Sequence, residues 1–201
     1  MRVPTHLLLA VVCVVAVAAV GSAAPESGDK DTKTRKTEAK FIEAARWGKL
    51  QVVVGAIEEG VDVNARDDEG ITAIRWAAVE GHTEVVSTLI KAGADVDAAD
   101  PGGVTALMMA ARWGYQDMAC PLIEAGAAVD TVSSTGPGRT ALMYAAIAGH
   151  QDMVNDLLQA KADPTIKDGH GRTASMLAKR WGKDEVADLL RKAEDAAQPG
   201  E

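Results

Sequence analysis

The residues of this chain that could do covalent or metal chemistry are too dispersed to form a catalytic site. A catalytic site would pair a nucleophile such as Cys120 with a base, but His82 and His150 occupy equivalent points of a regular spacing, which sets residues side by side rather than converging. The three aspartates in residues 95–100 lack the glycine turn and distal glutamate of a calcium loop. The sequence also lacks a phosphate-cradling glycine loop and a metal-ligand cluster. We predict no enzymatic activity, no cofactor and no metal.

Recognition chemistry is better represented, because three Arg-Trp pairs occupy one repeated position. Trp and Arg are the residues most enriched at binding hot spots. In the alternative interpretation each Trp packs against its neighbour and the Arg is a solvated cation stacked over it. The pairs, with the residues at the same position elsewhere, are Arg46, Trp47, Val79, Glu80, Arg112, Trp113, Ile147, Ala148, Arg180 and Trp181. Trp76, Met109 and Tyr144 are candidate half-buried supports of this protein-binding set.

Two independent markers show that the chain is built from repeats. The spacings of one glycine series are 33, 33, 35 and 33 residues, for Gly48, Gly81, Gly114, Gly149 and Gly182. The spacings of a threonine series are 33, 35 and 33 residues, for Thr72, Thr105, Thr140 and Thr173. Both series place a two-residue insertion in the same interval, and the inserted residues fall within 133–138. Such an insertion marks either a functional loop tip or tolerated drift.

One period contains the signals of two short helices and a projecting loop. In the second unit, Thr72 is expected to cap a helix over 73–80 whose small face holds alanines, and Gly81 permits the left-handed turn that ends it. Residues 84–91 carry apolar side chains at helical spacing. Residues 94–103 are polar and rich in turn formers, which predicts an extended hairpin. A unit of this size must stack on neighbours to bury its apolar face.

These units resemble ankyrin repeats. The resemblance rests on runs such as ITAIRWAAVEGHTEVVSTLIKAGADVDAAD and RTALMYAAIAGHQDMVNDLLQAKADPTIKD, which match the pattern T-P-L-H-x-A-A-x-x-G-H followed by V-x-x-L-L-x-x-G-A-D-V-N. It implies an all-α solenoid of about five stacked helix-turn-helix units with short β-hairpin or loop fingers, spanning 39–196. The expected units are 39–70, 71–103, 104–138, 139–171 and 172–196.

Several positions depart from that family pattern. Arg75 and Met108 stand where the family has histidine, so the family's usual hydrogen-bond network at this position is expected to be missing and partly replaced by Met packing. Lys161 takes the place of a glycine and is expected to adopt a positive φ. Pro121 falls inside a second helix, where it should remove one hydrogen bond.

The first 24 residues have the pattern of a secretory signal peptide. Arg2 and His6 precede an apolar run over 7–20, and small residues follow it. We predict a signal over 1–23, and hence a periplasmic or secreted protein; an uncleaved signal anchor is the alternative. Cys13 lies inside the apolar run, which argues against lipidation, and its loss leaves Cys120 as a lone thiol that is either inert or pairs with another chain.

The net charge disfavours two classes of partner, and the composition of the two terminal segments predicts disorder. The formal net charge of −8 disfavours nucleic acid and anionic membranes as partners. Residues 24–38 are charged and nearly without apolar side chains, which predicts a disordered linker, and 197–201 should be a disordered tail.

From these patterns we predict a protein-binding module outside the cytoplasm. It would hold an unidentified partner protein on its concave face and hairpin tips, sequestering or protecting it, and be monomeric alone. The alternatives are a membrane-anchored or self-assembling scaffold and a secreted effector that binds host proteins.

Overall fold

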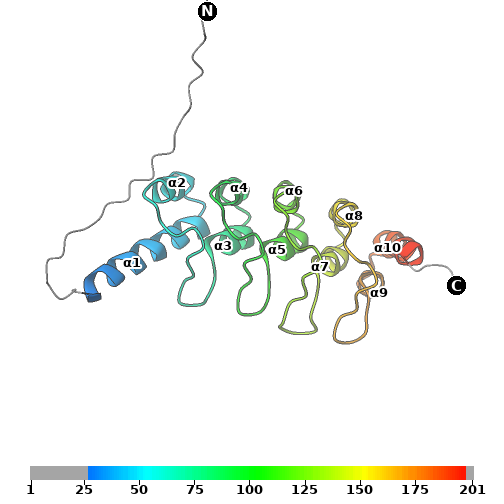
Figure 1. Ribbon diagram of the computed structural model, residues 1–201. Helices are drawn as coiled ribbons and strands as arrows, with labels where there is room; N and C mark the ends of the chain where they lie inside the picture. The colour runs from blue at the N-terminus through cyan, green and yellow to red at the C-terminus, as the bar shows by residue number, and fades with distance from the viewer. Residues whose placement is uncertain (1–26, 198–201) are drawn as a thin grey trace, which may run out of the picture.

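Residues 27–197, which the computed structural model describes, form a row of helix pairs (Figure 1). The predicted signal peptide, Cys13 and residues 198–201 of the predicted tail lie outside these residues. The helices of the described region are α1 (Ser27–Arg46), α2 (Leu50–Glu58), α3 (Ala73–Glu80), α4 (Thr83–Lys91), α5 (Ala106–Trp113), α6 (Gln116–Glu124), α7 (Ala141–Ala148), α8 (Gln151–Gln159), α9 (Ala174–Arg180) and α10 (Asp184–Ala197).

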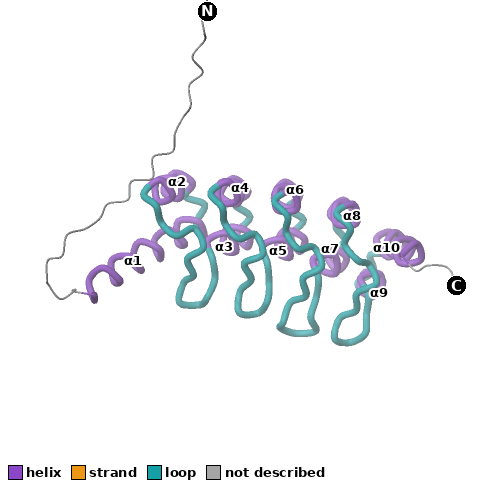
Figure 2. Tube along the Cα trace, viewed as in Figure 1, coloured by secondary structure: helices purple, strands orange, loops and turns teal. Residues whose placement is uncertain are grey.

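The helices form two rows with loops projecting to one side (Figure 2). Each first helix of a pair (α1, α3, α5, α7, α9) packs on the next first helix, and the second helices α2, α4, α6, α8 and α10 follow one another in the same order. Four loops, which we call fingers 1–4, follow the second helices at residues 59–72, 92–105, 125–140 and 160–173. The predicted all-α solenoid of five units is confirmed.

Small side chains allow the first helices to approach one another closely. Ala77 and Ala78 of α3 are fully buried, as are the equivalent alanines of α5 and α7. Longer side chains such as Leu89 and Leu122 close the space between the rows, and the buried residues form one continuous core cluster. The stack therefore has a thin, continuous core shared between neighbouring units.

The ends of the first helices follow the predicted chemistry in part. Gly81 and its counterparts in α5 and α7 adopt positive φ and end their helices as expected. The Oγ1 of Thr105 accepts a hydrogen bond from the Met108 amide, and Thr140 does the same in α7. Thr72 stands at the predicted N-cap position of α3, but its buried Oγ1 makes no hydrogen bond within the described residues, so its side chain does not cap the helix.

Helix α1 occupies part of the segment predicted to be a disordered linker. It begins at Ser27 rather than near residue 39, so residues 27–38 are helical and that part of the prediction is wrong. Phe41 and Ile42 are buried and fix the helix to the core. Once a turn is fixed, each further residue adds one hydrogen bond at little cost, so the charged residues before it continue the helix outward.

The fingers are loops rather than hairpins of two strands. Within residues 27–197 the only β-pairing is an isolated antiparallel bridge between Arg66 and Thr72. Lys161 has a φ of 66°, which confirms the expected left-handed conformation, and Pro121 lies inside α6 as predicted. No helix in the described part of the chain has the length and apolarity needed to cross a bilayer.

Candidate functional site

Three tryptophans project from the first-helix row. Trp47, Trp113 and Trp181 are 59%, 51% and 57% exposed. Each stands one residue before a glycine with positive φ, at the same place of units 1, 3 and 5. We call the pairs Arg46–Trp47, Arg112–Trp113 and Arg180–Trp181 the tryptophan ridge. More than half of the surface of each residue meets solvent, so burial against a neighbouring unit does not account for these side chains.

Arginine side chains order part of this ridge. The Arg46 guanidinium lies 4.0 Å from the centre of the Trp76 ring and 5.7 Å from that of Trp47. Arg112 lies 5.3 Å from the ring centre of Trp113. Trp76 itself is half-buried and donates from Nε1 to Asp67 Oδ2 at 2.7 Å, which fixes its ring. The first two pairs are therefore held by cation–π contacts, and Trp76 acts as a support.

The other predicted residues divide between surface and core. Glu80 is exposed, and Val79 and Ile147 are half-buried beside the core. Tyr144 is half-buried, with the Arg139 guanidinium 5.9 Å from its ring centre. Met109 is only 6% exposed, so its candidate contact with a partner is withdrawn and it belongs to the core.

The histidines after the turn glycines have a structural role. His82 Nε2 lies 3.1 Å from the carbonyl oxygen of Arg46, as expected of a hydrogen bond to loop backbone. Its ring lies directly over Gly48 of the preceding unit, and that of His150 lies over Gly114. His170 is on finger 4, with Nδ1 3.0 Å from Arg172 Nη2. No grouping of three or more potential metal ligands occurs in residues 27–197.

Aspartates of the fingers accept hydrogen bonds from backbone amides of the next finger. The Oδ1 atoms of Asp97 and Asp130 accept hydrogen bonds from the amides of Ala128 and Asp163, at 2.8 and 2.9 Å. Asn64 accepts from the Asp95 amide in the same way. These side chains therefore join the bases of consecutive fingers, which explains their spacing without a cation.

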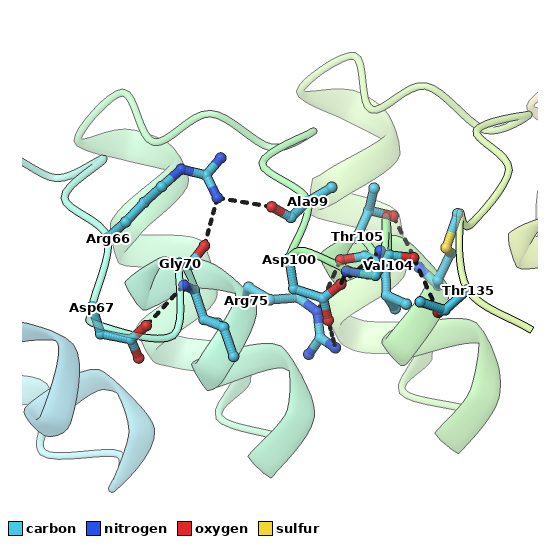
Figure 3. A network of polar contacts seen from close by, with 12 residues as sticks. Arg66, Asp67, Gly70, Arg75, Ala99, Asp100, Val104, Thr105 and Thr135 are labelled. Carbon is cyan, nitrogen blue, oxygen red and sulfur yellow. Dashed lines mark hydrogen bonds and ion pairs between the residues drawn. The ribbon is translucent and has the colours of Figure 1, made fainter.

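Two arginines that our sequence analysis did not single out for polar contacts, buried Arg75 of α3 and exposed Arg66 of finger 1, both bind finger 2 (Figure 3). Arg75 Nε donates to the Val104 carbonyl at 3.0 Å, and its Nη2 donates to Asp100 Oδ2 at 2.8 Å. Arg66 Nη1 donates to the Ala99 carbonyl. Burial lowers the pKa of Arg75, and the Asp100 carboxylate counteracts this. The expected loss of polar contacts at the family histidine position is therefore wrong for Arg75, although buried Met108 and Met143 confirm apolar packing elsewhere.

The two-residue insertion ties finger 3 to both of its neighbours. The amides of Ser134 and Thr135 donate to the Gly102 carbonyl of finger 2 at 2.9 and 3.2 Å. On the other side, the Gly169 amide of finger 4 donates to the Pro137 carbonyl. The segment that holds the insertion thus contacts both neighbouring fingers.

Cys120 is exposed on α6. Partial desolvation raises the pKa of its thiol, and the carboxylates of Asp156 and Glu124 raise it further. A raised pKa reduces the thiolate fraction and hence the reactivity of the thiol.

Comparison with known proteins agrees with the architecture. A family model described as ankyrin repeats (3 copies) matches residues 41–133 and 127–199. The search of curated proteins finds no match. With five stacked helix pairs, left-handed glycine turns and this match over most of its length, the chain belongs to the ankyrin-repeat family of protein–protein interaction modules.

Proposed function

We propose that this chain binds a partner protein outside the cytoplasm, through the tryptophan ridge and the finger tips, and thereby sequesters or protects it. The observation that carries the proposal is the exposure of Trp47, Trp113 and Trp181 at one place of alternate units. Trp offers a large contact area with few rotatable bonds, so its burial by a partner costs little side-chain entropy.

A rigid surface supports this proposal. The ridge stands on helices that share one core, and the fingers are connected laterally by hydrogen bonds. A surface already held in its binding geometry loses less conformational entropy when a partner docks. Binding, rather than catalysis, is what such a surface offers, in keeping with the interaction role of ankyrin-repeat proteins.

Location outside the cytoplasm rests on the sequence pattern of residues 1–24 alone. Expression of the full chain with a C-terminal tag, followed by cell fractionation and mass spectrometry of the tagged product, tests it directly. We expect an extracytoplasmic product beginning near Ala24. A cytoplasmic product that still contains residues 1–23 would contradict the proposed location.

The binding surface is tested by affinity capture from an extracytoplasmic extract. The bait is compared with the variant Trp47→Ala, Trp113→Ala, Trp181→Ala. The matched control is Val52→Ala, Met176→Ala, two apolar residues that are 52% and 53% exposed away from the ridge and the fingers. We expect the partner to be lost by the first variant and kept by the control; equal capture by both folded variants would refute the ridge.

A further inference from the structure

The tryptophan ridge differs in charge from the rest of the chain. The net charge of the whole chain is −8. At the two ridge positions of the five units, however, there are three arginines and a single acidic residue, Glu80. Most exposed acidic residues lie instead on the fingers and on the second helices, as at Glu58, Glu84, Asp117, Glu124 and Asp152. An acidic molecule therefore carries three arginines directly beside its exposed tryptophans.

These arginines lack ion-pair partners within the described residues. The ion pairs in residues 27–197 engage Arg75, Arg172, Lys179 and Arg191, and none involves Arg46, Arg112 or Arg180. Glu43 is exposed one turn before Arg46 on α1 but makes no ion pair with it. No carboxylate of residues 27–197 thus neutralises the ridge arginines, and their exposed N–H groups can donate to carboxylates of another molecule.

Stacking prepares two of these arginines for that contact. The guanidinium of Arg46 contacts the rings of Trp76 and Trp47, and that of Arg112 contacts the ring of Trp113. An aromatic contact restrains the plane of the guanidinium while its edge, which carries the N–H donors, stays available. A carboxylate matches that edge with two parallel hydrogen bonds.

We infer that the ridge binds an acidic, apolar segment of a partner protein, with carboxylates on the arginines and apolar side chains against the tryptophans. This inference rests on the proposed function and specifies the chemistry of the partner. Nucleic acid also combines stacking with negative charge, but a continuous phosphate backbone would meet Glu80 on the ridge and exposed Asp68, Asp95 and Asp97 on the fingers. Discrete carboxylates avoid those contacts.

Selection from a random peptide library displayed on phage tests the inference, with the full chain immobilised as bait. We expect enriched peptides to combine Asp or Glu with large apolar residues. Synthetic copies should bind about tenfold more weakly to the folded variant Arg46→Gln, Arg112→Gln, Arg180→Gln and should weaken as NaCl is raised. The control Lys40→Gln, Lys91→Gln, Lys192→Gln removes the same charge at exposed positions away from the ridge and the fingers and should keep binding.

The outcomes separate this inference from the proposed function. The selection could enrich neutral or basic peptides that no longer bind the Trp47, Trp113 and Trp181 variant. That result would contradict the inferred acidic partner but support the ridge as the binding surface. Peptides that bind this variant unchanged, or a selection with no enrichment, would overturn both. A short oligothymidine that binds the chain more tightly than the selected peptides would also overturn the inference, in favour of nucleic acid.

Discussion

At the scale of single residues, close approach between units constrains the turn glycines. Gly48 has a φ of +65°, and a Cβ there would lie 2.6 Å from the His82 ring. The His82 ring is held in turn by its contact with the Arg46 carbonyl. This glycine is therefore required both by its backbone conformation and by the neighbouring unit that packs on it.

Two glycine substitutions separate these requirements. Gly48→Ala should destabilise the chain more than Gly60→Ala, because Gly60 has a φ of +81° but a Cβ there would meet nothing within 4 Å. We expect about 1 kcal/mol for the left-handed alanine in each case, and about 1 kcal/mol more at Gly48 from displacement of His82. Urea denaturation followed by circular dichroism measures the difference; equal losses would show that the histidine moves aside freely.

The buried Asp168 carboxylate makes stability depend on acid pH. Burial acts to raise the pKa of Asp168, but hydrogen bonds from the Arg172 side chain and from backbone amides outweigh it and bring the pKa to about 2. Because the folded-state pKa is below the unfolded value of about 3.9, this stabilisation is complete above about pH 4 and is lost as the pH falls toward 2.

Asp168→Asn should therefore lower the free energy of unfolding and make it depend less on pH in the acid range. We expect a loss of roughly 2 kcal/mol near neutral pH that shrinks as the pH is lowered from about 4 to 2. Free energies of unfolding measured across this range check the prediction. The control Asp68→Asn removes an exposed carboxylate of finger 1; if the two variants behave alike, the Asp168 contacts are not responsible.

At the scale of elements, the Arg75–Asp100 pair connects the first helix α3 to finger 2 of the same unit. The side chains of Arg75 and Asp100 are only 9% and 15% exposed. Asp100 also accepts hydrogen bonds from the Gly102 and Val104 amides. Loss of either partner leaves the other charge largely desolvated.

A double-mutant cycle measures this connection. Arg75→Met, which introduces the residue found at the same place in the next two units, and Asp100→Asn should each destabilise the chain by about 2–4 kcal/mol. The double variant should cost less than the sum of the two single losses by about 1–3 kcal/mol, since no unpaired charge remains. Additive losses in urea denaturation would contradict the coupling.

The elements that the sequence predicts well are those whose signals recur. The glycine and threonine series identify the helix pairs of the middle units, because each unit meets the same packing requirement. The sequence does not reveal the start of α1 at Ser27, since a charged segment has no apolar period to indicate a helix that extends from a buried anchor. It does not reveal the Arg75–Asp100 pair either, because the partners belong to different elements, 25 residues apart.

The ridge is predictable for a similar reason. Three Arg-Trp pairs at one repeated position stand out in the sequence alone. Sequence does not decide between exposure and packing, because a ring at a helix end turns either toward solvent or toward its neighbour. The stacking of Arg46 on Trp76 involves residues of two units, so it depends on the placement of α1 beside α3.

At the scale of the whole molecule, stability is a sum of contacts between neighbouring units. Helix α9 packs on α7, and α10 packs on α8 and α9. Deletion of residues 172–201 would expose the apolar face of α7 that α9 now covers. By contrast, the side chains of residues 32–36 in α1 are exposed.

Two truncations test this unequal contribution. Deletion of residues 172–201 should destabilise the chain by several kcal/mol, because each large apolar side chain returned to water costs roughly 1.5–3 kcal/mol. Deletion of residues 27–36 should change the free energy of unfolding by less than about 1 kcal/mol. Thermal and urea unfolding of both variants check this; a large loss from the second deletion would assign the start of α1 a structural role.

Along the first-helix row, tryptophan alternates with a smaller residue from one unit to the next. This alternation would fix the position of a docked ligand along the row. Glu80 and Ala148 occupy the same position in the units between the three tryptophans. Adjacent units therefore do not offer equivalent binding positions. A ligand that slips by a single unit would set its apolar groups against a carboxylate and a methyl group instead of aromatic rings. Equivalent docking positions along the row of units would therefore recur at every second unit.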